Sequence, residues 1–239
     1  MFDAIAGRYD LLNRVLSGGL DGRWRARAIA ALNLTGRETV LDLCTGTADL
    51  ALAAASGPAH ARRIVGVDFS AAMLRLAQEK ARRAGHAEAT GEGGPAAPAV
   101  GFIRGDATHL PLKDGTMDAV TIGFGIRNVE DPAKACREIL RVLNPRGTLV
   151  ILELSLPRAV LMRSAYLWYA RWVLPLIGRV ISGHRSAYTY LPASVEAFLP
   201  PEAFAQLLRD CGFSAVRAVP LTMGVVYMFV ATKGDPGAV

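Results

Sequence analysis

The chain has 239 residues, of which 51% are hydrophobic, and its net charge of +6 comes almost wholly from arginine, because lysine occurs only at positions 80, 113, 134 and 233. No run of eighteen apolar residues free of charge occurs, which argues against a membrane-spanning helix, and the N-terminus lacks the apolar core of a signal peptide. No basic block with interleaved aromatics occurs either, so a weak attraction to anionic lipid is favoured over nucleic-acid binding.

The first predicted strand covers residues 39–43 and continues into Cys-Thr-Gly-Thr-Ala-Asp, with a predicted helix over residues 50–55. Asp42 lies near the end of this strand, and the next strand, residues 64–67, is followed by a second acid, Asp68. Strand, turn, helix and acid-ended strand form the layout of a Rossmann-like nucleotide-binding unit.

The turn holds one glycine, Gly46, where the dinucleotide fingerprint G-x-G-x-x-G needs three, so pyrophosphate binding is poorly supported. Asp42 would repel a phosphate but suits the ammonium and sulfonium charges of S-adenosylmethionine, and Asp68 can accept hydrogen bonds from both ribose hydroxyls. Each acid alone could be a cap or turn former, but the pair at this spacing favours a methyl donor. Thr45 and Phe69, beside Gly46 and Asp68, complete the candidates in these two turns.

The middle of the chain continues the alternation. A helix capped by Ser70 is predicted to bury Met73, Leu74, Ala77 and Ala81. Residues 85–99 lack periodicity and are predicted to form a flexible surface insertion. After the strand at 100–103, Asp106 could accept a hydrogen bond from the adenine amino group, and the Ala107 N–H could serve a ring nitrogen.

The fourth strand, residues 119–124, runs into Gly-Ile-Arg-Asn-Val. Gly123, Arg127 and Asn128 are therefore expected at the carboxyl edge of the sheet, where ligands bind in open α/β folds. Glycine lets a ligand approach the backbone, which favours a functional Arg127–Asn128 pair over a solvated loop.

The remaining elements complete an α/β fold: a Rossmann-like, doubly wound, mostly parallel sheet with an antiparallel edge strand. They are a helix opened by Asp131-Pro132 and stopped by residues 144–147, a strand at 148–154, a helix at 202–211 ended by Gly212, and strands at 215–219 and 225–232 that could pair antiparallel at the edge.

Residues 156–190 break this rhythm, because they are too aromatic and too basic for a linker. They include Arg163, Tyr166, Trp168, Tyr169, Arg171, Trp172, Arg179, Arg185, Tyr188 and Tyr190. Two interpretations stay open. The segment is either an amphipathic helix packed on the sheet or a lid that lines an apolar tunnel and turns its arginines toward lipid headgroups.

The three cysteines, Cys44, Cys136 and Cys211, follow no metal or disulfide spacing. Packed, unpaired thiols in a reducing compartment are the plain interpretation. We therefore expect a cytoplasmic protein that can touch the inner face of the membrane and that has no metal site.

Four stretches carry a resemblance to a known family. They are FDAIAGRYD at residues 2–10 with Asn13 and Trp24, the loop at 41–49, GFGIRNV at 123–129, and YTYL at 188–191 with Ser194 and Phe198. The chain resembles the ubiquinone/menaquinone biosynthesis C-methyltransferases, a class I S-adenosylmethionine-dependent family, over residues 2–233. The loop is generic to the superfamily, whereas FGIRNV and the opening Tyr9-Asp10 are much more specific.

The alternation of strands and helices argues for a single domain over residues 1–239, which we expect to be a methyltransferase domain with an N-terminal helical cap at 1–35. The resemblance implies that Arg127 and Asn128 sit beside a quinol ring. It places in the donor site Thr47, Asp68, Asp106, Ala107 and Gly123. Two positions depart from the family pattern, since Asp21 and Phe229 stand where members often have histidine.

Carbon methylation needs an electron-rich ring carbon, and deprotonating a hydroquinone hydroxyl supplies it. A free phenol has a pKa of about 10, so the guanidinium of Arg127 is expected to favour the phenolate, with a water taking the proton. Asn128 would hold the other ring oxygen, and Tyr9 would close over both ligands. His109 and His184 are alternative bases, each favoured instead as a surface or packing residue.

Three rival functions remain. A class I methyltransferase of another small or lipid-like molecule would keep the donor loop without needing the aromatic segment. A nicotinamide-dependent oxidoreductase is disfavoured by the missing glycines and by Asp42, and a non-catalytic binder of S-adenosylmethionine or lipid leaves Arg127 and Asn128 unexplained. The ring class (naphthoquinol or benzoquinol), the tail length and the oligomeric state stay open.

Overall fold

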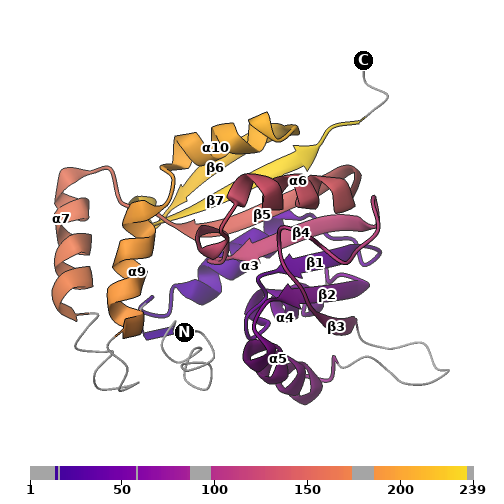
Figure 1. Cartoon of the computed structure of the whole chain (residues 1–239). Helices are drawn as coiled ribbons and strands as arrows, with labels where there is room; N and C mark the ends of the chain where they lie inside the picture. The colour runs from indigo at the N-terminus through magenta and orange to yellow at the C-terminus, as the bar shows by residue number, and fades with distance from the viewer. Residues whose placement is uncertain (1–13, 16, 58, 87–97, 174–185, 236–239) are drawn as a thin grey trace.

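The computed structural model describes residues 14–15, 17–57, 59–86, 98–173 and 186–235. Its framework is a seven-stranded sheet with helices on both faces (Figure 1). The strands are β1 (Thr39–Leu43), β2 (Arg63–Asp68), β3 (Ala99–Arg104), β4 (Met117–Gly123), β5 (Leu143–Leu154), β6 (Phe213–Leu221) and β7 (Val226–Lys233). The helices are α3 (Asp21–Ala31), α4 (Asp49–Ala55), α5 (Ala71–Arg83), α6 (Pro132–Val142), α7 (Val160–Trp168), α9 (Ser186–Ala197) and α10 (Pro201–Asp210).

The strand order is β3-β2-β1-β4-β5-β7-β6, and β1 to β5 are joined by parallel pairings. The predicted doubly wound, mostly parallel sheet is therefore confirmed. The antiparallel strand is β7, which pairs with both β5 and β6, so that β6 forms the outer edge. Because the order reverses between β1 and β4, the crevice at the carboxyl ends of these two strands is where this fold binds ligands.

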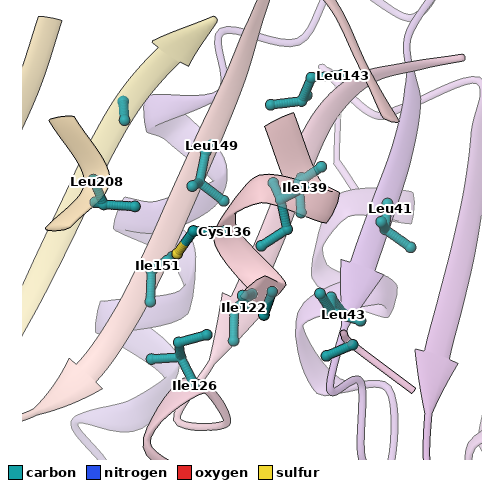
Figure 2. Close-up of a cluster of buried hydrophobic side chains, with 14 of the residues drawn as sticks. Leu41, Leu43, Ile122, Ile126, Cys136, Ile139, Leu143, Leu149, Ile151 and Leu208 are labelled. Atoms are coloured by element: carbon teal, nitrogen blue, oxygen red, sulfur yellow. The ribbon is translucent and has the colours of Figure 1, made fainter. Parts of the chain in front are cut away.

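The two faces of the sheet carry separate cores. Helices α6 and α10 cover one face, and Figure 2 shows Cys136 and Ile139 of α6 lying over Ile122 of β4 and Ile151 of β5. The other face is covered by α3, α4 and α5, whose buried residues include Trp24 and Ala28. Strands covered on both faces are expected to be mostly apolar, and β1, β4 and β5 are so apart from the buried Asp42, Thr121 and Glu153.

Two predicted helix caps are confirmed. The Ser70 hydroxyl accepts a hydrogen bond from the Met73 N–H at 3.1 Å, and the Asp131 carboxylate accepts one from the Lys134 N–H at 2.9 Å. Helix α6 ends at Val142, before the predicted stop at 144–147, because Leu143 already has an extended backbone and begins β5. Gly212, with φ of +104°, ends α10 in a left-handed conformation that suits glycine.

The irregular segments are described in part. Residues 156–190 form α7 and a π-helical turn, η3 (Tyr169–Val173), but residues 174–185 lie outside the described residues. So do 87–97 of the predicted insertion and 1–13 of the predicted N-terminal cap, of which α3 is the described helix. Among the helices that the structure describes, none is long and apolar enough to cross a membrane.

Candidate functional site

The loop between β1 and α4 has a tightly turned backbone. Cys44, Gly46 and Ala48 all have positive φ, at +55°, +55° and +68°. Left-handed backbone at a non-glycine residue costs about 1 to 2 kcal/mol, so the loop must be held by its surroundings. The Thr45 N–H donates to the Val67 carbonyl at 3.0 Å, and the Gly46 N–H donates to Oδ2 of Asp68 at 2.8 Å.

Asp42 holds this loop from inside the sheet. Its side chain is buried, and its carboxylate accepts hydrogen bonds from the Thr45 hydroxyl at 2.6 Å, the Thr121 hydroxyl at 2.7 Å and the Ala51 N–H at 3.1 Å. Burial raises the pKa of Asp42 to about 6, although these three hydrogen bonds oppose the shift. Asp42 therefore has the turn-forming role that the sequence analysis weighed for it, and its contact with a ligand ammonium stays a prediction.

Asp68 connects the ends of β1 and β2. Besides the bond from Gly46, its Oδ1 accepts a hydrogen bond from the Ser70 N–H at 2.8 Å. The next side chain, Phe69, is 73% exposed, and the Arg104 guanidinium lies 5.7 Å from the centre of its ring. An exposed aromatic ring beside a carboxylate offers a flat surface and a hydroxyl acceptor side by side, which suits a nucleoside.

The end of β3 adds a second carboxylate. Oδ1 of Asp106 accepts a hydrogen bond from the Thr108 N–H at 2.8 Å, and this bond holds the pKa of Asp106 below its usual value. The carboxylate thus stays ionised and can accept hydrogen bonds at neutral pH. Ala107, beside it, is buried.

Two hollows flank the loop and contain all nine predicted donor-site residues. The larger, of about 460 Å³, falls in the size range of small-molecule sites. Its lining includes Gly46, Asp68, Phe69, Asp106, Ala107, Gly123 and Asn128. The smaller, of about 50 Å³, is lined by Asp42, Thr45, Thr47 and Arg25 among others, and shares Gly46 and Gly123 with the first.

Arg127 has a partner that the sequence analysis missed. Its Nη1 lies 2.6 Å from Oε1 of Glu153, with the two side chains only 7% and 1% exposed. The same Nη1 donates to the Phe124 carbonyl at 2.5 Å, and Nε donates to the Ser194 hydroxyl on α9 at 3.3 Å. Glu153 was detectable as an isolated acid in the apolar strand 148–154, but only the pairing of β4 with β5 brings it to Arg127.

Of the predicted acceptor-site residues, the structure places only some at the larger hollow. Asn128 lines the larger hollow, whereas Arg127 is not among the described residues that line it. Tyr9 and His184 lie outside the described residues. His109 has a largely exposed side chain, and its Nε2 is 2.8 Å from the Lys134 amine.

The two positions that depart from the family pattern also have defined surroundings. Asp21 is buried and accepts a hydrogen bond from the Ser17 hydroxyl at 3.0 Å. Phe229 is buried between the rings of Phe204 and Tyr227, at centroid distances of 4.9 and 6.1 Å. No group of three or more His, Cys, Asp or Glu placed to hold a metal occurs within the described ranges.

Comparison with known proteins gives a consistent result. The model of the ubiE/COQ5 methyltransferase family matches residues 1–233. The demethylmenaquinone methyltransferase of Thermus thermophilus is 45% identical over 98% of this chain and 100% of its own length. The ubiquinone/menaquinone biosynthesis C-methyltransferase UbiE of Syntrophotalea carbinolica is 43% identical over 99% of this chain and 94% of its own length.

A solved structure supports the same fold. A putative S-adenosyl-L-methionine-dependent methyltransferase from Methanococcus maripaludis superposes with a TM-score of 0.68, covering 100% of this chain and 97% of its own. Its sequence identity to this chain is 18%, so the likeness concerns the fold.

Proposed function

Because the chain belongs to the ubiE/COQ5 methyltransferase family, it is an S-adenosylmethionine-dependent methyltransferase, and we propose that it methylates a ring carbon of a prenylated quinol, demethylmenaquinol first of all. The observation that carries the proposal is the family match over residues 1–233, together with identities of up to 45% to relatives named for that reaction. A benzoquinol of ubiquinone biosynthesis is the second candidate acceptor, since other relatives carry both pathways in their names.

S-adenosylmethionine supplies an electrophilic methyl group on a sulfonium. For its nucleoside, the larger hollow offers Asp68 to the ribose hydroxyls, Asp106 to the adenine amino group and the ring of Phe69 to the adenine face. The fit rests on the chemistry of this lining, which has three acidic residues (Asp68, Asp106 and Glu130) and an exposed aromatic ring. Among the described lining residues there is no basic side chain that would mark a phosphate site.

On the acceptor side, Asn128 is proposed to hold a ring oxygen at the rim of the hollow. The charge of Arg127 is offset by Glu153, so the pair favours a phenolate only where the guanidinium is the nearer group. The proposed phenolate role of Arg127 therefore depends on Glu153 keeping its side chain behind it. Closure by Tyr9 remains part of the proposal.

Residues 156–190 are proposed to form a lid that also touches the membrane surface. Four large apolar side chains of α7 and η3 are exposed, namely Val160, Leu161, Trp168 and Trp172, at 61 to 85%. Arg163 and Arg171, on the same elements, are exposed as well. Apolar and cationic groups on one exposed helix suit an anionic lipid interface, to which each arginine would add about 1 kcal/mol.

The reaction is tested with purified protein, methyl-labelled S-adenosylmethionine and two acceptors, demethylmenaquinol and a ubiquinone-pathway benzoquinol. We expect label in the ring of the naphthoquinol, and none when the protein is left out of the reaction. Quinones extracted from a deletion strain should contain the accumulated demethylated species. Label on neither ring, with an intact strain quinone profile, would refute the proposal.

Membrane contact is tested by flotation with anionic and neutral vesicles. The protein should float with anionic vesicles, and less so at high salt, and the double variant Trp168→Ser, Trp172→Ser should lose flotation without a change in melting temperature. A stable variant that floats like the wild type would contradict the lid proposal, whereas an unfolded one would favour a packed helix.

A further inference from the structure

Arg25 lies beside the loop between β1 and α4, although neither the sequence motifs nor the chemistry of nucleoside binding predicts a role for it. Its side chain lines the smaller hollow together with Thr45, Thr47 and Asp49. Helix α3 carries Arg25 there because the neighbouring Trp24 is buried, donates a hydrogen bond to the Thr222 hydroxyl at 2.8 Å and meets the Phe124 ring at a centroid distance of 6.0 Å. The two contacts of Trp24 thus fix the part of α3 that carries Arg25.

Charges of both signs surround this hollow. Nη1 of Arg25 lies 2.9 Å from Oδ2 of Asp49, and Nη2 pairs with Asp21 one helical turn earlier. Asp49 also pairs with Lys80 of α5. A guanidinium carries five N–H donors in a planar fork, so Arg25 can bind a further carboxylate while it keeps these two contacts.

The size and position of the hollow restrict its occupant. A single water needs roughly 10 to 15 Å³ of such space, so about 50 Å³ admits a few atoms and excludes a nucleoside. The two hollows share Cys44, Gly46, Gly123 and Phe124, so a ligand whose nucleoside lies in the larger one can extend its other end into the smaller one. That end is a zwitterion in S-adenosylmethionine, with one carboxylate and one ammonium.

We propose that Arg25 recognises the carboxylate of the donor's methionine end and that Asp49 and Asp42 face its ammonium. This inference rests on the proposed methyl-donor function and adds a specificity-determining residue on α3, outside the loop motif. It predicts that the protein discriminates between nucleosides that carry the amino-acid end and nucleosides that lack it.

The test is calorimetric titration of the full chain with S-adenosylhomocysteine and with 5′-methylthioadenosine, which lacks the amino acid. We expect Arg25→Gln to bind S-adenosylhomocysteine about 10- to 100-fold more weakly than the wild type, as the loss of a charge-assisted hydrogen bond implies, and to bind methylthioadenosine unchanged. Arg25→Lys should fall between, because it keeps the charge without the fork. Arg27→Gln, an exposed position on the same helix, is the matched control and should bind both ligands as the wild type does.

A second measurement needs no variant. The wild type should bind decarboxylated S-adenosylmethionine at least about 10-fold more weakly than the intact donor. Equal affinity for these two, or an Arg25→Gln protein with wild-type melting that loses both nucleosides equally, would overturn the proposal. A wild type that binds S-adenosylhomocysteine but methylates no quinol would refute the proposed acceptor and leave the role of Arg25 standing.

Discussion

The carboxylate of Asp42 is fully buried, and its pKa is raised in the folded protein. Because burial raises its pKa in the folded protein to about 6, above the unfolded value of about 3.9, the native state binds the proton more tightly than the unfolded chain. The contribution of this group to stability is therefore largest below about pH 4 and is lost as pH rises through 6. Above that pH the ionised carboxylate lowers stability by up to about 3 kcal/mol.

We predict that Asp42→Asn stabilises the protein at neutral pH. The asparagine oxygen can accept from Thr45 and Ala51, and its amide can donate to the Thr121 hydroxyl, without a buried charge. At pH 7.5, urea denaturation should give a free energy of unfolding about 1 to 3 kcal/mol higher for the variant than for the wild type. This difference should vanish near pH 4. Parallel stability profiles from pH 4 to 7.5 would show that Asp42 is not the titrating group.

Glu153 and Arg127 form the second buried charge system. Removing one member of a buried ion pair leaves the other uncompensated, which typically costs 3 to 5 kcal/mol. We predict that Glu153→Gln lowers the free energy of unfolding by about this amount, as measured by urea denaturation. As the control, Asp235→Asn, which weakens the pair with the exposed Arg146, should change the free energy of unfolding by less than about 1 kcal/mol. Equal effects of the two substitutions would mean that the Arg127–Glu153 pair is solvated.

At the level of elements, the contact between α3 and the turn η4 (Thr222–Gly224) joins parts of the chain 198 residues apart. We predict that Trp24→Phe and Thr222→Val each lower stability and that a double-mutant cycle gives a coupling of about 1 kcal/mol, the value of one hydrogen bond. Denaturant midpoints of the four proteins measure it. Strict additivity would mean that α3 is held by packing alone.

Local signals predicted the elements better than the contacts between them. The caps at Ser70 and Asp131 and all seven strands followed from residues that act on their own neighbourhood. The same signals gave the candidates that line the larger hollow, since strand ends in a parallel sheet meet at one edge. Glu153 and Arg25 escaped, because their partners lie on other elements and only the folded sheet and α3 bring them into place.

For the whole molecule, ligand binding at the carboxyl edge of the sheet should stabilise the folded state. Loops from β1, β2, β3 and β4 all line the larger hollow, so a ligand there binds only the folded chain. At a concentration 100 times its dissociation constant, S-adenosylhomocysteine should raise the free energy of unfolding by about 2.7 kcal/mol. In a domain of this size, that raises the melting temperature by about 5 to 10 °C. Thermal melting measures the shift, and Asp68→Asn, which weakens the proposed ribose acceptor, should reduce it. An equal shift in that variant would place the nucleoside elsewhere.

The place of β7 between β5 and β6 has a consequence for how the chain is made. β5 is finished about seventy residues before β7 begins, yet residues 148–154 of β5 depend on β7 for their outer hydrogen bonds. At roughly 5 to 20 residues per second, a ribosome leaves this apolar strand without its neighbour for about 4 to 14 s. During that interval its edge can pair with other nascent chains, so the yield of soluble protein should depend on translation speed and chaperone supply more than on the stability of the finished fold.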